Sequence, residues 1–346
     1  MIRVPPRPIR RIVLAPAALV VAVAVVLLSP VLAAAAVLLD VFAGRWRTLR
    51  VVGFGVVYCV YEVAGLLALF GLWVRAGAGV RLRSPALQDA HYRIMSRWLR
   101  GLRAMGLRLF RLQISIEDPP TPRSGPILVF SRHAGAGNSL MLVATLLLEY
   151  GRHPRIIMLE KLQWEPLFDT LLNRIPNRFI RHDASVRDAQ LAAIGALATG
   201  LGDRDAFVLF PEGRDFTPTL RERAIDRLRT KGHHESAEKA EQMAHVLPPR
   251  HGGVMAAIAN APDADVCFVA HTLFEDVGSL GQLWRRIPLD EAVSARYWRI
   301  PAAEVPKDEE ELIAWLYDWW GRIDGWISGR VQSLDRARAS AQPAES

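Results

Sequence analysis

The sequence predicts an α/β protein whose sheet is flanked by helices, preceded by two hydrophobic helices that anchor the chain in a membrane. Two observations predict the sheet. Short apolar segments of strand length alternate with segments of helical pattern, and two of these strands end in polar residues beside glycine. The anchor is predicted by two long apolar runs that precede the alternating part of the chain.

The first 83 residues are predicted to form the membrane-anchoring region. The apolar run 12–39 has no charged residue, and the run 51–74 has only Glu62. Each is long enough for the roughly 18–20 residues that cross a bilayer as a helix. A cleaved signal peptide would have a much shorter apolar part, so we expect a retained anchor. Glu62 either has a functional role, as acids in membrane segments often do, or faces a helix partner or the interface.

The orientation of the two runs stays open. A hairpin of crossing helices would leave three arginines within residues 44–50 on the outer side, against the positive-inside tendency. Both flanks carry more arginine than this loop, which favours a cell-membrane protein with its main domain on the cytoplasmic side. Alternatively, both helices dip into one leaflet and return, with the arginine corner at headgroups or water.

Residues 84–300 are predicted to form the main domain. It opens with a basic amphipathic helix at 91–111, which either contacts anionic lipid or packs as an ordinary helix with a solvated face. The polar, basic insertion near 217–250 is predicted to be helical, lying over the membrane or substrate mouth or on the surface. Strands are expected at 112–116, 127–130, 155–158, 206–210 and 266–270, and helices at 140–150, 185–199 and 254–259.

Residues 301–346 are predicted to hold a C-terminal amphipathic helix and a disordered tail. Acidic residues open the segment 306–327, and its tryptophans recur at helical spacing. The helix either packs on the domain or seats these tryptophans at a membrane interface. The last dozen residues have the composition of a disordered tail.

The most informative segment is 126–140, in which an apolar strand leads through His133 into a glycine-rich turn and an apolar helix. Asn138 follows five positions after His133. A second strand, 206–210, ends in Pro-Glu-Gly-Arg at 211–214. Because parallel strands end at one edge of a sheet, these two motifs predict two halves of one active site.

This pair of motifs resembles the glycerolipid acyltransferase family, the relatives of lysophosphatidic acid acyltransferase. The family's first signature is a histidine followed five positions later by aspartate, whose place Asn138 takes. The second is Phe-Pro-Glu-Gly with an arginine close behind, and here Arg214 stands one place earlier than usual. The resemblance covers roughly residues 125–275. It implies a fatty acyl group moved from acyl-CoA or an acyl carrier protein to a lysophospholipid hydroxyl, without a cofactor.

Weaker matches to this family imply residues that hold the acceptor. Lys161, together with Arg178 and Arg181, resembles the acceptor-binding block. With Arg214, beside Gly213, these cations could grip a phosphate through charge-assisted hydrogen bonds. The alternative for each is an ordinary surface charge, because arginine is common in this chain.

The residues of the first motif suit acyl transfer from a thioester. His133 can act as the general base, and Gly135 and Gly137 let backbone N–H groups approach the oxyanion at a helix N-terminus. The resemblance implies that Glu212 organises the site. Asn138 can accept a hydrogen bond from the histidine but brings no charge, or else it serves with its neighbour Ser139 as a helix N-cap.

Two alternatives of other kinds remain. The substitution at Asn138 is compatible with a silent relative that binds lipid or a partner protein. The Arg132–His133 pair is also similar to the start of histidine phosphatases, with His271 as the second histidine.

The net charge of +8 and the pI near 10.0 point to an anionic partner. With no nucleic-acid motif, membrane lipid fits better than nucleic acid. The two cysteines and the histidine spacing predict neither a disulfide framework nor a metal site.

Overall fold

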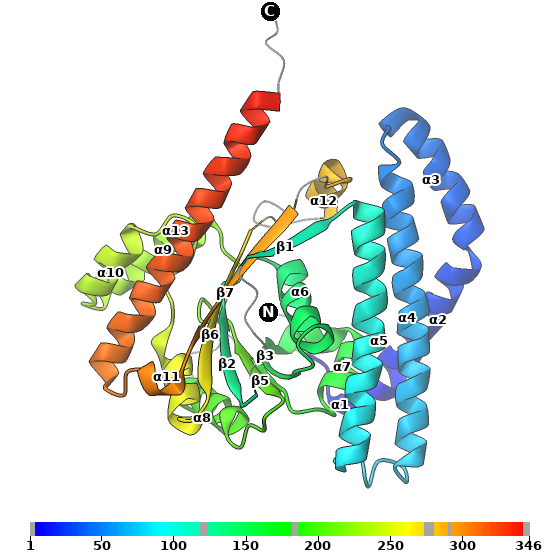
Figure 1. Cartoon of the computed structure of the whole chain (residues 1–346). Helices are drawn as coiled ribbons and strands as arrows, with labels where there is room; N and C mark the ends of the chain where they lie inside the picture. Colours follow the sequence, from blue (N-terminus) through cyan, green and yellow to red (C-terminus); the bar gives the residue numbers. More distant parts are fainter. Residues whose placement is uncertain (1–3, 118–123, 182–185, 273–279, 290–291, 342–346) are drawn as a thin grey trace, which may run out of the picture. The chain divides into compact units, whose positions relative to one another are not determined.

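The computed structural model describes residues 4–117, 124–181, 186–272, 280–289 and 292–341 (Figure 1). The chain forms two compact units that interleave along the sequence. The first unit comprises residues 1–113, 140–190 and 279–291, and the second comprises residues 114–139, 191–278 and 292–346. Residues of the segment 84–300 therefore belong to both units. The seven described strands form a mixed sheet flanked by helices, which confirms the predicted α/β class.

Five strands of the sheet belong to the second unit, in the order β1-β7-β6-β2-β5. They are β1 (Gln113–Glu117), β2 (Ile127–Ser131), β5 (Asp205–Leu209), β6 (Asp265–His271) and β7 (Ala292–Ile300). β2 lies parallel to both β5 and β6, whereas β7 is antiparallel to β6. Every residue of β2 is buried, as its unbroken apolar sequence predicts for a central strand.

The first unit contributes the parallel pair β3 (His153–Leu159) and β4 (Arg178–Ile180). The strands β4 and β7 were not predicted from the sequence. β4 has three residues, too few to show a period. β7 alternates buried and half-buried positions and carries arginines on its less buried face, which lowers its apolar signal.

The remaining helices of the second unit are α9 (Pro218–Thr230), α10 (His234–Glu241), α11 (His251–Asn260) and α13 (Glu309–Ala341), and the predicted insertion is thus a helix pair. The rings of Trp315, Trp319 and Trp320 surround Phe268 of β6 at 4.9–6.1 Å between centroids. The C-terminal helix therefore packs on the domain. It runs on to Ala341, into the segment with the composition of a tail, and residues 342–346 lie outside the described part.

Two helices connect segments of the two units: α6 (Ala136–Leu148) and α8 (Arg187–Ala198). The predicted start of the latter, residue 185, lies outside the described residues. The helices of the first unit are α1 (Arg7–Ile9), η1 (Arg10–Leu14), α2 (Ala15–Leu27), α3 (Ser29–Ala43), α4 (Arg47–Arg75), α5 (Pro85–Phe110), η2 (Glu160–Trp164), α7 (Pro166–Leu172) and α12 (Leu280–Arg286).

The first apolar run forms two helices rather than one. α2 ends before Leu28 and α3 begins at Ser29, because Pro30 lacks the N–H that would continue the hydrogen bonds of α2. Asp40 lies in the last turn of α3, directly after the apolar run. Its carboxylate accepts hydrogen bonds from the backbone N–H groups of Thr48 and Leu49 at 2.9 and 2.8 Å. These bonds satisfy donors at the start of α4 that would otherwise be unpaired.

α4 is packed along its length by neighbouring helices of the first unit. α5 runs beside it (Figure 1), and the rings of Phe54 and Phe110 lie 4.9 Å apart. Gly101 of α5 leaves room for Tyr61, which a Cβ atom would meet at 2.0 Å. Glu62 is buried beside Glu165, at the start of α7, so it faces a helix partner.

Two helical segments, Arg7–Leu27 and Arg47–Arg75, are long and apolar enough to cross a membrane by length and composition. Many apolar side chains of α2 and α3 are exposed, and Phe42 is 92% exposed. Others exposed by more than half are Val20, Val21, Leu27, Val31, Leu38, Leu39 and Val41. A contiguous apolar surface of this kind is stable only against an apolar surrounding, which indicates membrane association.

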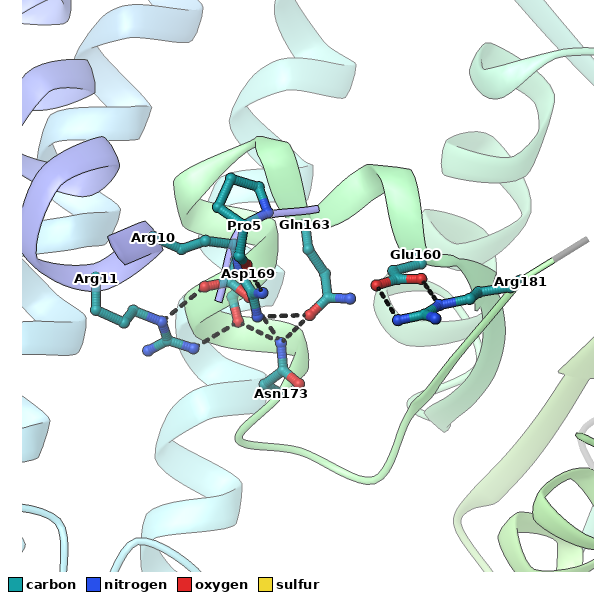
Figure 2. Close-up of polar contacts among 8 residues, drawn as sticks. All are labelled: Pro5, Arg10, Arg11, Glu160, Gln163, Asp169, Asn173 and Arg181. Atoms are coloured by element: carbon teal, nitrogen blue, oxygen red, sulfur yellow. Dashed lines mark hydrogen bonds and ion pairs between the residues drawn. The ribbon is translucent and has the colours of Figure 1, made fainter. Parts of the chain in front are cut away.

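The start of the first apolar run is held by a buried cluster centred on Asp169 of α7 (Figure 2). One carboxylate oxygen accepts from Arg10 at 2.9 Å and the other from Arg11 at 2.7 Å. Arg10 also donates to Gln163 at 2.8 Å, and Asn173 donates to Asp169 at 3.0 Å. Because the two guanidinium groups are engaged here, the first helices are part of the folded unit.

Replacing Asp169 by alanine is expected to lower the free energy of unfolding by about 3–5 kcal/mol, because two guanidinium groups lose their carboxylate in a buried place. The check is the thermal unfolding midpoint of the detergent-solubilised protein. Asp226→Ala is the matched control, since it removes an exposed ion pair with Arg229 worth less than about 1 kcal/mol. Equal losses in the two variants would contradict the structural role of Asp169.

Candidate active site

The two sequence motifs meet at one edge of the sheet in the second unit. β2 and β5 pair in register up to Phe130 and Leu209, so the residues that follow each strand emerge side by side. The β2–β6 pair ends at the same edge, and the N–H of Arg132 donates to the carbonyl of Val269 at 3.1 Å. Parallel pairing thus brings His133 next to the second motif, about 80 residues later.

Glu212 joins the two motifs by hydrogen bonds. One carboxyl oxygen accepts the backbone N–H of His133 at 3.1 Å, and the other accepts the N–H of Leu247 at 3.0 Å. Glu212 is 1% exposed. Burial raises its pKa to about 8, although the charge of Arg132 and these N–H donors partly oppose the rise. The side chain predicted to organise the site therefore holds the loop that carries His133.

His133 contacts the second motif and the residues that directly follow it. The carbonyl of His133 accepts the N–H of Phe216 at 2.9 Å. The centroid of the His133 ring lies 4.7 Å from the centroid of the Phe210 ring. Nδ1 of His133 lies 2.9 Å from Oδ1 of Asp215. This nitrogen is buried and has no hydrogen bond of favourable angle among the described residues, so the two atoms are in close contact without a hydrogen bond. The side chain is 20% exposed, which leaves the ring reachable.

Gly135 and Gly137 occupy different positions in the turn. Gly135 has φ +99°, a conformation that favours glycine. Its N–H donates to Oδ1 of Asp215 at 2.8 Å, so an oxyanion would have to compete with that carboxylate. Gly137 lies in the first turn of α6 and is exposed, where N–H groups have no partner within the helix.

Asn138 has a local partner. Its side-chain N–H donates to the carbonyl of Ala134 at 2.8 Å, and its own carbonyl oxygen is buried without a hydrogen bond among the described residues. The N-cap alternative is wrong, because α6 begins at Ala136 and both Asn138 and Ser139 lie inside its first turn. The amide therefore bonds back to the turn.

A loop at residues 244–247, which was not predicted from the sequence, supports this site. Asp324 of α13 accepts the N–H groups of Ala244 and His245 at 3.1 and 2.6 Å. The guanidinium of Arg132 donates to the carbonyls of His245 and His271. An arginine placed between an apolar strand and the motif histidine was a sequence signal for such a network. Its partners, however, lie more than 100 positions away along the chain.

These contacts disfavour the histidine phosphatase alternative. Arg132 is fully buried and donates to backbone carbonyls. His271 is buried, and its Nε2 lies 3.1 Å from the carbonyl of Arg132. Burial lowers the pKa of His271 to about 3, so this ring is neutral. Both side chains hold the fold together and neither is placed to bind a phosphoryl group.

Gly213 and Arg214 form the turn after β5. Gly213 has φ +69°, and its N–H donates to the carbonyl of Phe210 at 2.9 Å. A Cβ atom there would lie 3.2 Å from the guanidinium of Arg250, so a larger residue would be crowded as well as strained. Arg214 is exposed, as a residue that meets an acceptor would be.

The other three predicted acceptor residues lie in the first unit. Lys161 lies in η2, two positions after the end of β3, whereas Arg178 begins β4 and Arg181 directly follows it. All three are exposed. Arg181 forms a two-pronged ion pair with Glu160, with one bond at 3.1 Å (Figure 2). Within the described parts of the chain, no cluster of three or more histidine, cysteine or acidic side chains could hold a metal ion.

Stability is expected to fall as the pH rises from about 4.5 to about 8, through the ionisation of Glu212. The unfolded chain loses this proton near the ordinary value of 4.5, whereas the folded chain keeps it to about 8. In that window the folded state binds more protons, so raising the pH favours unfolding by up to about 1.4 kcal/mol per unit. Glu212→Gln should remove this slope in unfolding measurements across the window. The exposed Glu222→Gln serves as the control, and parallel curves for wild type and Glu212→Gln would contradict the assignment.

No family model matches this chain, and no curated protein matches it in sequence. The chain is similar to the crystal structure of the 1-acyl-sn-glycerophosphate (LPA) acyltransferase PlsC from Thermotoga maritima, with 14% identity and a TM-score of 0.42. That similarity covers 82% of this chain and all of the other.

Proposed function

We propose that this protein is a membrane-bound O-acyltransferase that moves a fatty acyl group from acyl-CoA, or an acyl carrier protein, to a hydroxyl of a lysophospholipid such as lysophosphatidic acid. One observation carries the proposal: the loop of His133 is fixed by Glu212, with the histidine ring reachable and a carboxylate beside its Nδ1. This arrangement prepares a general base at the strand edge where both halves of the motif meet.

The reaction proceeds by direct attack. Nε2 of His133 takes the proton of the acceptor hydroxyl while the oxygen attacks the thioester carbonyl carbon. The tetrahedral intermediate collapses, the carbon–sulfur bond breaks, and the imidazolium returns its proton to the leaving thiolate. N–H groups in the first turn of α6, such as that of Gly137, have no partner within the helix and are candidate donors to the oxyanion.

The acceptor of this reaction is an anionic lipid. Arg214 is exposed two residues after Glu212, and a guanidinium holds phosphate through paired hydrogen bonds. In the first unit, Lys161, Arg178 and Arg181 remain candidates for binding an anionic headgroup, because they are exposed cations near the ends of β3 and β4.

We propose that the N-terminal helices dip into the cytoplasmic leaflet of the cell membrane. The support comes from α5, which runs along α4 and exposes Arg93, Arg97 and Arg100. If α4 crossed the bilayer, these charges would enter the hydrocarbon, which costs about 2.5–3.5 kcal/mol or more for each arginine. A shallow position of the helices leaves these arginines near phosphate headgroups, where they favour binding of the protein to the membrane.

The decisive test is thiol release from long-chain acyl-CoA by the reconstituted protein, with a panel of lysophospholipid acceptors. Wild type should release thiol only when acceptor is present, and His133→Ala should lower the rate by about 10²–10⁴-fold through loss of the base. His234→Ala, which changes an exposed histidine, is the matched control. No release by wild type with any acceptor and with either donor would favour the silent relative.

Arg214→Ala is expected to raise KM for lysophosphatidic acid about 10-fold, the effect of one charged hydrogen bond. KM for monoacylglycerol, which lacks the phosphate, should change little. Arg223→Ala removes another exposed arginine of the second unit and serves as the control. An equal rise for both acceptors would show that Arg214 does not read the phosphate.

A further inference from the structure

We infer that Asp215 takes the part that an aspartate at position 138 would play, holding the imidazole of His133 in its working orientation. This inference rests on the proposed acyl transfer, and it assigns a positioning residue to that reaction. Asp215 directly follows the second motif, 82 positions along the chain from His133, so no spacing rule points to it.

The contacts of Asp215 support this role. Its Oδ1 lies 2.9 Å from Nδ1 of His133 and also accepts the N–H of Gly135 at 2.8 Å. The backbone bond from Phe216 to the carbonyl of His133, at 2.9 Å, fixes the next residue of the same loop. One carboxylate oxygen thus bridges the histidine ring and the turn that follows it.

Asn138 has a different environment. Its amide N–H groups face the carbonyl of Ala134, and its carbonyl oxygen has no hydrogen bond within the described structure. An amide in this position carries no charge that could stabilise an imidazolium. The negative charge near Nδ1 of His133 comes instead from Asp215.

The chemistry of the step explains why the carboxylate matters. When Nδ1–H points at Asp215, the lone pair of Nε2 is free to take the proton of the acceptor hydroxyl. The imidazolium that forms is stabilised by the carboxylate, which itself takes no proton. Asp215 is 57% exposed, so water screens its charge. We therefore expect an effect of about 10–100-fold, below the roughly 10⁴-fold of a buried triad aspartate.

The kinetic experiment compares Asp215→Asn, Asn138→Asp and the double variant with wild type in the thiol-release assay. Asp215→Asn should lower kcat about 10–100-fold with KM within about 2-fold, because ring orientation acts in the transition state. The double variant, with a carboxylate restored at position 138, should recover part of that loss. Asp226→Asn, an exposed aspartate of the same unit, is the control. Unchanged kcat in Asp215→Asn would overturn the inference.

A second readout does not depend on activity. Nitrogen-15 histidine spectra report which imidazole nitrogen carries the proton, and the His133 signal is the one missing from His133→Ala. At alkaline pH, wild type should show His133 protonated at Nδ1, and Asp215→Asn should shift it toward the Nε2 tautomer. An unchanged tautomer would overturn the inference even if wild type is active. If wild type releases no thiol, the acyltransferase proposal fails, and the tautomer shift alone decides whether Asp215 positions the ring.

Discussion

The buried carboxyl group of Glu212 is the contact on which the rest of the candidate site depends. It accepts the N–H of His133 and the N–H of Leu247, and it thereby connects the turn after β2 with the 244–247 loop. A carboxyl group with 1% exposure is costly unless its oxygens are hydrogen-bonded, so these two bonds must persist for the fold to be stable. The position of His133 is fixed by the same requirement.

The C-terminal helix extends this constraint to the end of the chain. Asp324 of α13 caps two N–H groups of the 244–247 loop, and Arg132 donates to the carbonyl of His245. Tryptophans of α13 pack around Phe268 of β6, which lies beside β2. The amphipathic pattern of this helix therefore serves the core and the site together, and its position is set by both apolar packing and hydrogen bonds.

The first unit combines opposite solvent requirements. At the start of its apolar helices, the charges of Arg10 and Arg11 meet Asp169. Further along, α2 and α3 expose apolar side chains that need an apolar surrounding. α5 covers α4 but presents arginines outward. The shallow position in the membrane that we propose would satisfy these demands together, because the apolar helices would meet lipid while the arginines would stay near headgroups.

Features that repeat along short stretches of the chain could be predicted without the structure. Apolar periods predicted the α/β class and β2, β5 and β6, and the composition of two long runs predicted the N-terminal helices. Glycine beside His133 and Glu212 marked the two strand ends. Tertiary structure alone decided which side chains meet. β4 is too short to show an apolar period, and the arginines of β7 lower the apolar signal by which a strand is predicted. The pairing of Asp215 with His133 depends on the register between β2 and β5, because residues about 80 positions apart share no local signal.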